Sequence, residues 1–336
     1  MIKNKTVVVV GAGASKDIGL PLGDGLKKSV ADILSDEGHK VRRYLYAAAT
    51  AYMKRDNNRV ESAFQAAARY AAPLRHAASI DNFLDQHNDE HDFVAVAKMS
   101  IAYVLAEAEK NSRLGGTRTA AEAMDRTSSY FMHDLLNIVV RNHQASNIAE
   151  SLDNLSFIIF NYDRCVERFL DFWLKFRFGI GGQALIDPSM FVHVYGSLGD
   201  YFSADTPNPF EYTGEMAFQN PHHDLPRYVD RIRLFTEQED STTHSTISYL
   251  VGEAETIIFL GFGFEEQNMR FFEERSSGKK IFCTLMGMSD VNRGFICDGL
   301  VARFSSIDNW VYPVVGPSGQ LFRDCYFPLT SAVGSI

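Results

Sequence analysis

Cysteine is scarce in this sequence, and its spacing excludes the common uses of the residue. The four cysteines are widely separated and form no C-x-x-C pair; they are Cys165, Cys283, Cys297 and Cys325. A structural zinc site normally draws its thiolates from two such pairs, and a disulfide framework needs a higher density of cysteine. We therefore expect neither bound zinc nor disulfides, and we expect a reducing cytoplasm as the compartment.

Positive charge and long apolar runs are also lacking. The 33 Lys and Arg residues are outnumbered by 42 Asp and Glu residues, which gives a formal net charge of −9. A protein that neutralises the phosphates of nucleic acid normally carries a basic face, so direct nucleic-acid binding is not expected. No stretch reaches 18 uncharged apolar residues, and the run at 6–10 is too short for a membrane span. We expect a soluble protein that does not contact a membrane.

The sequence does contain an alternation of buried strands and helices. A β-branched run at 6–10 precedes a glycine turn, which is the pattern of a buried parallel strand. Further strand patterns occur at 155–160, 190–195, 228–235, 256–260 and 280–285. Helical stretches, including 164–177 and 265–274, separate several of them. This alternation predicts βαβ units and a parallel sheet.

A long helical segment interrupts the alternation. Between residues 24 and 150 no comparable strand pattern occurs, whereas apolar residues recur at helical spacing, as at Leu26, Val30 and Ile33. We therefore predict an α/β fold with a large helical insertion between the first and second strands. The predicted parts are a sheet domain of residues 1–24 and 151–300, an insertion of residues 25–150, and a C-terminal tail of residues 301–336.

The first motif with chemical meaning is the glycine turn after the first strand, Gly11-Ala12-Gly13-Ala14-Ser15. A turn between a strand and a helix presents backbone N–H groups that favour a phosphate. The dinucleotide fingerprint of dehydrogenases requires a third glycine where this chain has Lys16, and the P-loop pattern is absent too. Hydride-transfer enzymes therefore fit poorly. A tight turn without a ligand is the alternative.

The second motif is Asn161-Tyr162-Asp163, which follows the predicted strand at 155–160. Open α/β sheets bind ligands at the carboxyl ends of their strands, where these side chains should lie. Asn161 is suited to hold a water molecule or a ribose hydroxyl. Asp163 either bonds the same sugar or only caps the following helix.

Two more motifs end in glycine turns. His193 and Tyr195 lie two residues apart on a predicted strand, so their side chains should share a face, and Gly196 follows. His193 is a candidate base, although a lone histidine is often structural. The other turn contains Gly261 and Gly263 and leads to Asn268 near a helix start, a pattern that any βα junction can show.

Taken together, these motifs resemble the sirtuin-like superfamily, in particular its bacterial NAD⁺-consuming branch, many members of which act in anti-phage defence. The resemblance extends from residue 6 to about residue 290, and the segment from Ser79 to Leu84 is a weaker part of it. The matching residues are Gly11–Ser15, Gly19–Pro21, Asn161–Asp163, Tyr195–Ser197 and Gly261–Gly263.

The resemblance implies a Rossmann-like sheet that binds NAD⁺ as a substrate, with no prosthetic cofactor. Because the chain lacks the cysteine pairs of the zinc ribbon that deacetylating sirtuins carry, NAD⁺ hydrolysis is favoured over deacetylation. Asn161 would position the ribose and the attacking water, with Asp163, His193 and Tyr195 as the other catalytic candidates. The nucleotide would be bound by Gly11, Ala12, Gly13, Ser15, Pro21, Gly196, Ser197, Gly261, Gly263 and Asn268.

This chain departs from the family at the base, since Tyr195 stands where the family has a histidine before the glycine. The ordinary pKa of tyrosine, about 10, makes it a poor base at neutral pH, and His193 is expected to take over. An NAD⁺ hydrolase that was always active would kill its host. We therefore expect activation by homo-oligomer formation or by a partner such as a HerA-type ATPase, in a bacterial anti-phage defence system.

Two other functions remain open from the sequence. The first is a nucleotide-binding assembly subunit that has lost turnover, with Tyr195 marking the lost base. The second is a nuclease, which requires clustered carboxylates to hold metal ions. Asp81, Asp85, Asp89 and Glu90 are close enough in the sequence to be considered for that role, and a solvated helix face is the alternative.

Overall fold

The computed structural model describes most of the chain. The described residues are 4–117, 119–141, 143–144, 147–203, 208–211, 217–218, 220–234, 236–237, 242–272, 278–304 and 311–331. Within these ranges no helix is both long and apolar enough to cross a membrane.

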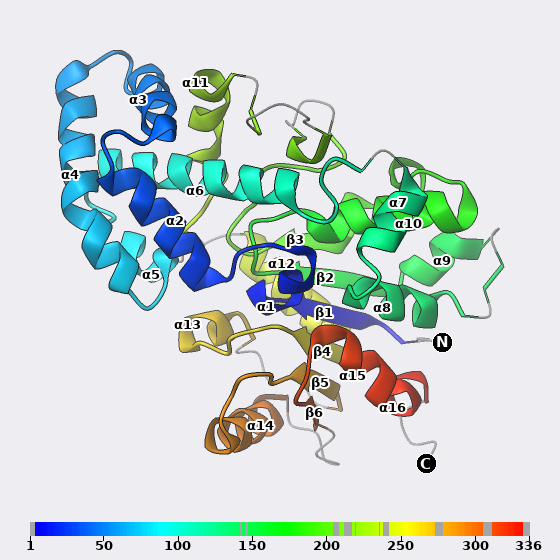
Figure 1. The fold of residues 1–336 in the computed structure, drawn as a ribbon. Coiled ribbons are helices and arrows are strands. Elements are labelled where there is room, and N and C mark those ends of the chain that lie inside the picture. The colour runs from blue at the N-terminus through cyan, green and yellow to red at the C-terminus, as the bar shows by residue number, and fades with distance from the viewer. Residues whose placement is uncertain are drawn as a thin grey trace.

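A six-stranded, all-parallel sheet forms the centre of the fold (Figure 1). Its strands are β1 (Thr6–Val10), β2 (Leu155–Ile159), β3 (Phe191–His193), β4 (Thr256–Leu260), β5 (Lys280–Thr284) and β6 (Val311–Val314). Their order is β3-β2-β1-β4-β5-β6, so the direction of winding reverses between β1 and β4. This Rossmann-like arrangement confirms the predicted α/β fold, and the reversal is the point at which such sheets place ligands.

The register of the three central strands brings their carboxyl ends to one edge. Val10 of β1 pairs with Ile159 of β2 on one side and with Leu260 of β4 on the other. All five residues of β1 are buried, with Val7 and Val9 in one core and Val8 and Val10 in the other. A strand covered on both faces explains the uninterrupted apolar run in the sequence.

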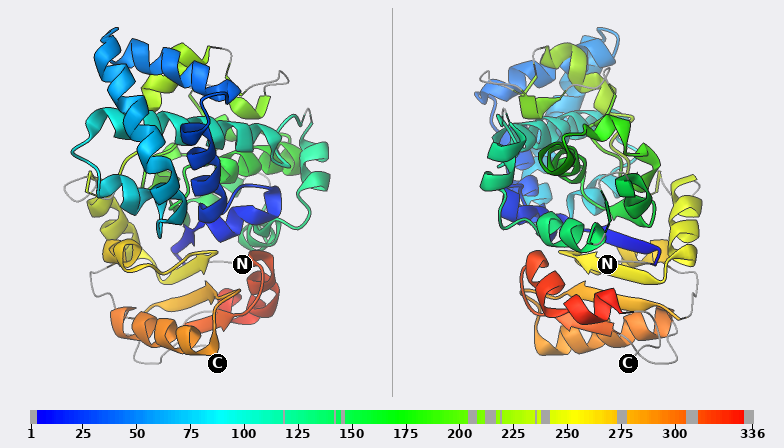
Figure 2. Two further views of the ribbon diagram at one scale, coloured as in Figure 1. Left: turned by 60° about the vertical axis from the view of Figure 1, so that its left-hand side comes forward. Right: turned by 90° about the vertical axis from the view of Figure 1, so that its right-hand side faces the viewer.

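Helices cover both faces of the sheet. The insertion contains α2 (Gly23–Ser35), α3 (Lys40–Tyr52), α4 (Asn57–His76), α5 (Ile80–Asp85), α6 (His91–Asn111), α7 (Ala120–Arg126), α8 (Phe131–Val139) and α9 (Ile148–Leu152). Buried residues of α2 to α6 belong to the core on one face, and those of α7 to α9 to the core on the other. The insertion is therefore divided between the two layers, and α2, α4 and α6 pack against one another (Figure 2).

The remaining helices complete the two layers. They are α1 (Ala12–Ser15), α10 (Cys165–Phe178), α11 (Pro221–Asp224), α12 (Thr242–Glu253), α13 (Glu266–Met269), α14 (Asp290–Phe304), α15 (Ser318–Asp324) and α16 (Tyr326–Thr330). The 3₁₀ turns are η1 (Lys16–Ile18), η3 (Gly182–Ala184), η4 (Pro188–Met190), η5 (Pro209–Glu211), η6 (Leu225–Tyr228) and η7 (Arg270–Phe272). Buried residues of α12 and α14 pack on the α2–α6 side of the sheet, and those of α10, α15 and α16 on the other.

Two strand predictions need correction. The strand predicted at 228–235 is wrong, because the turn η6 ends at Tyr228 and residues 229–234 contain no strand. Ile232 and Leu234 are buried in the same core as the insertion helices, so their alternation reflects loop packing. Conversely, the segment predicted as a tail from residue 301 adds β6, α15 and α16. Pro313 makes the sequence of β6 unlike that of a strand. Proline is tolerated at this position because β6 is an edge strand.

Candidate functional site

Two glycine turns meet at the carboxyl edge of β1 and β4. The N–H of Gly11 donates to the carbonyl oxygen of Leu260 (2.9 Å), and the N–H of Gly13 donates to that of Gly261 (3.0 Å). A Cβ atom on Gly11 would lie 2.5 Å from the carbonyl oxygen of Gly261, so a larger residue is excluded. Two of the amides that the sequence suggested for a phosphate therefore donate to the end of β4 and to the turn after it, and glycine is required for this close backbone contact.

Because the two turns are in contact, we predict that alanine at Gly261 destabilises the protein more than alanine at a glycine with open space around it. The φ of Gly261 is +55°, and a Cβ atom would lie 2.0 Å from the backbone nitrogen of Ala14. Gly287 has a φ of +81° and open space around it, so Gly287→Ala isolates the backbone cost of about 1–2 kcal/mol. We expect Gly261→Ala to reduce the free energy of unfolding by about 1–3 kcal/mol more, because overpacking is added. Urea denaturation of both variants measures the difference, and equal losses would show that the turns are not in close contact.

A cleft opens beside these turns. A cavity of about 310 Å³ is lined by Ala12 and Ser15, by residues 20–24, by residues 78–81 and by residues 160–163, together with Leu26, Leu105 and Glu265. An adjoining cavity of about 410 Å³ shares Ala78, Ser79 and Glu265 and extends to Gln267 and Arg270. The segments that follow β1, β2 and β4 at the sheet edge form one side of the cleft, and residues of α2, α5 and α6 line the other.

Asn161 lies in the wall of this cleft, next to the first glycine turn. Its side chain is buried, and its Nδ2 donates a hydrogen bond to Oγ of Ser15 (3.1 Å). The motifs that follow β1 and β2 are 146 residues apart in the sequence and are thus in direct contact. Ala12 and Pro21, two further residues expected to bind the nucleotide, line the same cavity.

Of the two roles weighed for Asp163 in the sequence, the structure shows the helix cap, and the contact with a sugar stays a prediction. Oδ1 of Asp163 accepts a hydrogen bond from the N–H of Cys165, the first residue of α10 (3.1 Å), and the residue also lines the cavity. Burial, followed by the nearby Glu109 carboxylate, raises the pKa of Asp163 to about 6. The side chain therefore caps a helix and also offers the cleft a carboxyl group that titrates near neutral pH.

The raised pKa predicts that Asp163→Asn stabilises the protein at neutral pH. Folding raises the pKa of this carboxyl from 3.8 to about 6, so the folded state favours the protonated form. The resulting contribution to stability is complete below about pH 4 and is lost as the pH rises through 6. Asparagine keeps an acceptor for the Cys165 N–H and carries no charge. We expect a gain of about 1–3 kcal/mol in the free energy of unfolding at about pH 7.5 that vanishes at about pH 4.

Asp171 is the matched control for this prediction. It is equally buried, but its carboxylate pairs with Lys175 (2.7 Å) and accepts the N–H of Gly182 (2.7 Å). Asp171→Asn should therefore destabilise the protein at neutral pH, because it removes a paired charge. Urea denaturation at both pH values tests the pair of variants, and a loss of stability in Asp163→Asn at neutral pH would contradict the assignment.

Asp81 of the insertion reaches the same cavity. Ser79 caps the start of α5 by accepting the N–H of Asn82 (3.1 Å), which places Asp81 in the first helical turn. The carboxylate of Asp81 accepts a hydrogen bond from the Tyr162 hydroxyl. Burial raises the pKa of Asp81 to about 6. The sequence does not connect Asp81 with Tyr162, because the two residues are 81 positions apart.

His193 does not lie where the sequence analysis expected it. It is absent from the cavity lining; its Nδ1 faces the backbone carbonyl of Asn161 (3.0 Å) and its Nε2 faces the Glu167 carboxylate (2.7 Å). Burial alone would lower the pKa of His193, but Glu167 raises it above its ordinary value. Since both ring nitrogens face acceptors, the imidazolium form is favoured, and this form cannot accept a proton. In this geometry His193 holds the Asn161 backbone.

The expectation that His193 and Tyr195 share a strand face is wrong. Strand β3 ends at His193, and Tyr195 turns to the opposite side of the sheet. Its hydroxyl donates to Oδ1 of Asn268 (2.6 Å), and Nδ2 of Asn268 donates to Glu265 (2.7 Å). Burial raises the pKa of Tyr195 well above its ordinary value. Neither Tyr195 nor Asn268 lines the first cavity; Asn268 bonds Glu265, which does, and the ring of Tyr195 packs against Phe160 and Tyr162 of the lining.

The other glycine-turn residues have structural contacts. A Cβ atom on Gly196 would lie 1.8 Å from the carbonyl oxygen of Arg231. Ser197 accepts the N–H of Gly199 (3.1 Å) and so stabilises its own turn. Gly263 leaves space for the Glu265 carboxylate, which lies 2.9 Å from its ideal Cβ position. None of these three residues lines the cavity that contains Asn161.

The cleft is acidic. Four carboxylates line the first cavity, namely Asp24, Asp81, Asp163 and Glu265. Asp85 and Glu266 add two more in the second cavity, where Arg270 is the cation among the described lining residues. Such a lining favours a ligand with cationic or hydroxyl-rich parts and leaves one region suited to a phosphate.

The carboxylates do not converge as a metal site would require. Asp81 bonds Tyr162, Asp85 bonds Thr236, and Glu90 bonds Tyr70. In the part of the chain that the structure describes, no group of three or more His, Cys, Asp or Glu residues could hold a metal ion. The geometry therefore gives no support to the nuclease hypothesis.

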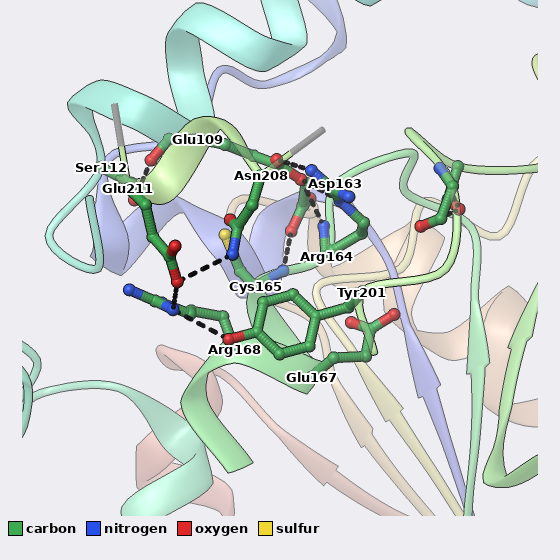
Figure 3. Close-up of polar contacts among 12 residues, drawn as sticks. Glu109, Ser112, Asp163, Arg164, Cys165, Glu167, Arg168, Tyr201, Asn208 and Glu211 are labelled. Atoms are coloured by element: carbon green, nitrogen blue, oxygen red, sulfur yellow. Dashed lines mark hydrogen bonds and ion pairs between the residues drawn. The ribbon is translucent and has the colours of Figure 1, made fainter. Parts of the chain in front are cut away.

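A buried ion pair joins the insertion to the segment that follows Asn161. Glu109 of α6 accepts the backbone N–H of Arg164 (2.8 Å) and forms an ion pair with its guanidinium (2.7 Å). The side chains are 0% and 1% exposed, respectively. Figure 3 shows Glu109 reaching the Asp163–Cys165 segment from the insertion side. The Asn161–Asp163 motif is thus held between Asp81 on one side and Glu109 on the other.

The sequence matches no family model, and no curated protein matches it.

Proposed function

We propose that the protein is an NAD⁺ glycohydrolase, which cleaves the bond between nicotinamide and ribose to release nicotinamide and ADP-ribose. The observation that supports it most is the position of Asn161. Its amide lies beside Ser15, in the wall of a cleft at the carboxyl ends of β1 and β2. An amide at this position can hold a ribose hydroxyl or the attacking water, as the resemblance to sirtuin-like proteins implies.

The acidic lining is suited to the chemistry of this bond. The nicotinamide ring of NAD⁺ is cationic and leaves as a neutral molecule, so the leaving group needs no proton. The ribose passes through an oxocarbenium-like state, whose positive charge nearby carboxylates stabilise. Water then attacks the anomeric carbon and loses a proton, and the carboxylates of Asp81 and Asp163 are candidates to accept it. No strong base is required, so the position of His193 outside the cleft is compatible with turnover.

The dimensions of the cleft agree with a dinucleotide. Two adjoining cavities of about 310 Å³ and 410 Å³ offer space for its two halves. Arg270 in the second cavity, which forms an ion pair with Glu266 (3.8 Å), would be the counter-charge for a phosphate. In this arrangement NAD⁺ is the substrate, and no prosthetic cofactor takes part.

The wider role that we propose is that of an effector in bacterial anti-phage defence, acting in the cytoplasm. Depletion of NAD⁺ stops growth, so the activity must be suppressed until infection. We propose that a homo-oligomer, or a partner such as a HerA-type ATPase, activates the enzyme. The insertion fits this role because it forms walls of the cleft, so that a partner bound to it would act directly on the site.

Chromatography of NAD⁺ incubated with the purified protein tests the function. The incubation is run with the protein alone and with an ATPase encoded beside it. Equal amounts of nicotinamide and ADP-ribose are the expected products. Intact NAD⁺ in both incubations, at protein concentrations that allow oligomers to form, would reject the proposal.

A second candidate function is nucleotide binding without turnover. It is favoured by Tyr195, which replaces the histidine of the family, and by the engagement of His193 with Glu167. Calorimetry separates the two functions: tight binding of ADP-ribose together with intact NAD⁺ would indicate an assembly subunit.

A further inference from the structure

Helix α5 of the insertion supplies one carboxylate to the first cavity, that of Asp81. Asp81 lies beside Asn161 and Asp163 in the lining, although 80 residues separate it from Asn161 in the sequence. The cap formed by Ser79 and the hydrogen bond from Tyr162 hold it there. The insertion therefore contributes a charged group to the site and not only a wall.

The partners of the lining carboxylates differ in charge. Asp24 forms an ion pair with Lys27 (2.9 Å), so its charge is already compensated. Glu265 accepts a hydrogen bond from Asn268, and Asp163 accepts one from the N–H of Cys165. Asp81 accepts its hydrogen bond from the neutral hydroxyl of Tyr162. A cationic ligand at this wall would compensate the charge of Asp81.

We propose that Asp81 contacts the ligand and makes the cleft selective for the cationic, oxidised nicotinamide ring over the neutral, reduced ring. This inference depends on the proposed nucleotide site. The two rings are nearly the same size, so shape alone separates them poorly. A partly buried carboxylate such as Asp81 separates them, because the attraction between opposite charges increases as water is excluded.

A matched ligand pair tests this selectivity without turnover. Carba-NAD⁺ has a cationic ring and a bond that resists hydrolysis, and carba-NADH is its neutral, reduced form. Calorimetry of the full chain with each ligand gives two dissociation constants. We expect the native protein to bind carba-NAD⁺ at least about tenfold more tightly, which corresponds to about 1.4 kcal/mol.

Three variants assign the selectivity to Asp81. Asp81→Asn should reduce the preference to about twofold or less, because the shape is kept and the charge is removed. Asp24→Asn changes a carboxylate of the same cavity that Lys27 already compensates, so the preference should persist. Tyr162→Phe removes the hydrogen bond to Asp81 but keeps its charge, so the preference should also persist. Circular dichroism verifies that each variant is folded.

The outcomes separate this inference from the proposed function. Equal binding of the two ligands to the native protein would overturn the inference and leave NAD⁺ hydrolysis to the chromatographic assay. A preference that survives in folded Asp81→Asn would assign the selectivity elsewhere and would also overturn it. If Asp81→Asn does not fold, loss of the preference in Tyr162→Phe would contradict the inference. If neither ligand binds the native protein, both the nucleotide site and the inference fail.

Discussion

Replacing Asn161 by alanine is expected to reduce the rate of NAD⁺ hydrolysis by about 100- to 1000-fold, the usual cost of removing one preorganised dipole at a transition state. The amide is buried in the wall of the cleft, where few waters can replace it, and its backbone is held by His193. Because the side chain orients the ribose or the attacking water, most of the loss should appear in kcat and not in KM. Chromatographic rates over a range of NAD⁺ concentrations measure both constants.

Ser15→Ala is the matched control for this variant. It removes the same hydrogen bond, from Nδ2 of Asn161 to Oγ of Ser15, but leaves the amide in place. A loss of about tenfold or less is expected, since one hydrogen bond contributes about 0.5–1.5 kcal/mol. If Ser15→Ala were as damaging as Asn161→Ala, the amide would act only by holding the glycine turn. Full activity in Asn161→Ala would remove this residue from the mechanism.

The fold was predictable where burial on two faces leaves a clear sequence pattern. The continuous apolar run of β1 and its glycine turn indicate a parallel strand, and β2, β4 and β5 show comparable patterns. Strand β6 lacks this pattern because it lies at an edge of the sheet, is largely not buried and contains Pro313. The segment predicted as a strand at 228–235 has the reverse property: it alternates like a strand, yet residues 229–234 pack as a loop in the core that contains the insertion helices, and residue 235 lies outside the described residues.

The sequence predicts which turns meet at the candidate site, but it does not predict which side chains contact one another there. Asn161 lies beside the Gly11–Ser15 turn because parallel strands in register bring their carboxyl ends together. The direction of a side chain beyond a strand end follows no such rule, so His193 and Tyr195 diverge. Asp81 lies on a helix far away in the sequence, and only tertiary packing brings it to Tyr162.

The largest change in stability is expected from Glu109→Ala. This substitution would remove the Glu109 carboxylate from the guanidinium of Arg164, which is 1% exposed. Breaking a buried ion pair on one side typically costs about 3–5 kcal/mol, because the remaining charge stays desolvated. Urea denaturation followed by circular dichroism should show a loss of this size.

Glu109→Gln separates the charge from the hydrogen bonds. The amide oxygen can still accept the backbone N–H of Arg164, which Glu109 accepts at 2.8 Å, so a smaller loss is expected. Arg164 directly follows the Asn161–Asp163 motif, so both variants should also reduce NAD⁺ hydrolysis, and the alanine variant should do so more. A stable Glu109→Ala protein would mean that solvent or another carboxylate reaches Arg164. In that case α6 would not hold the segment after Asn161, and the insertion could move without disturbing the site.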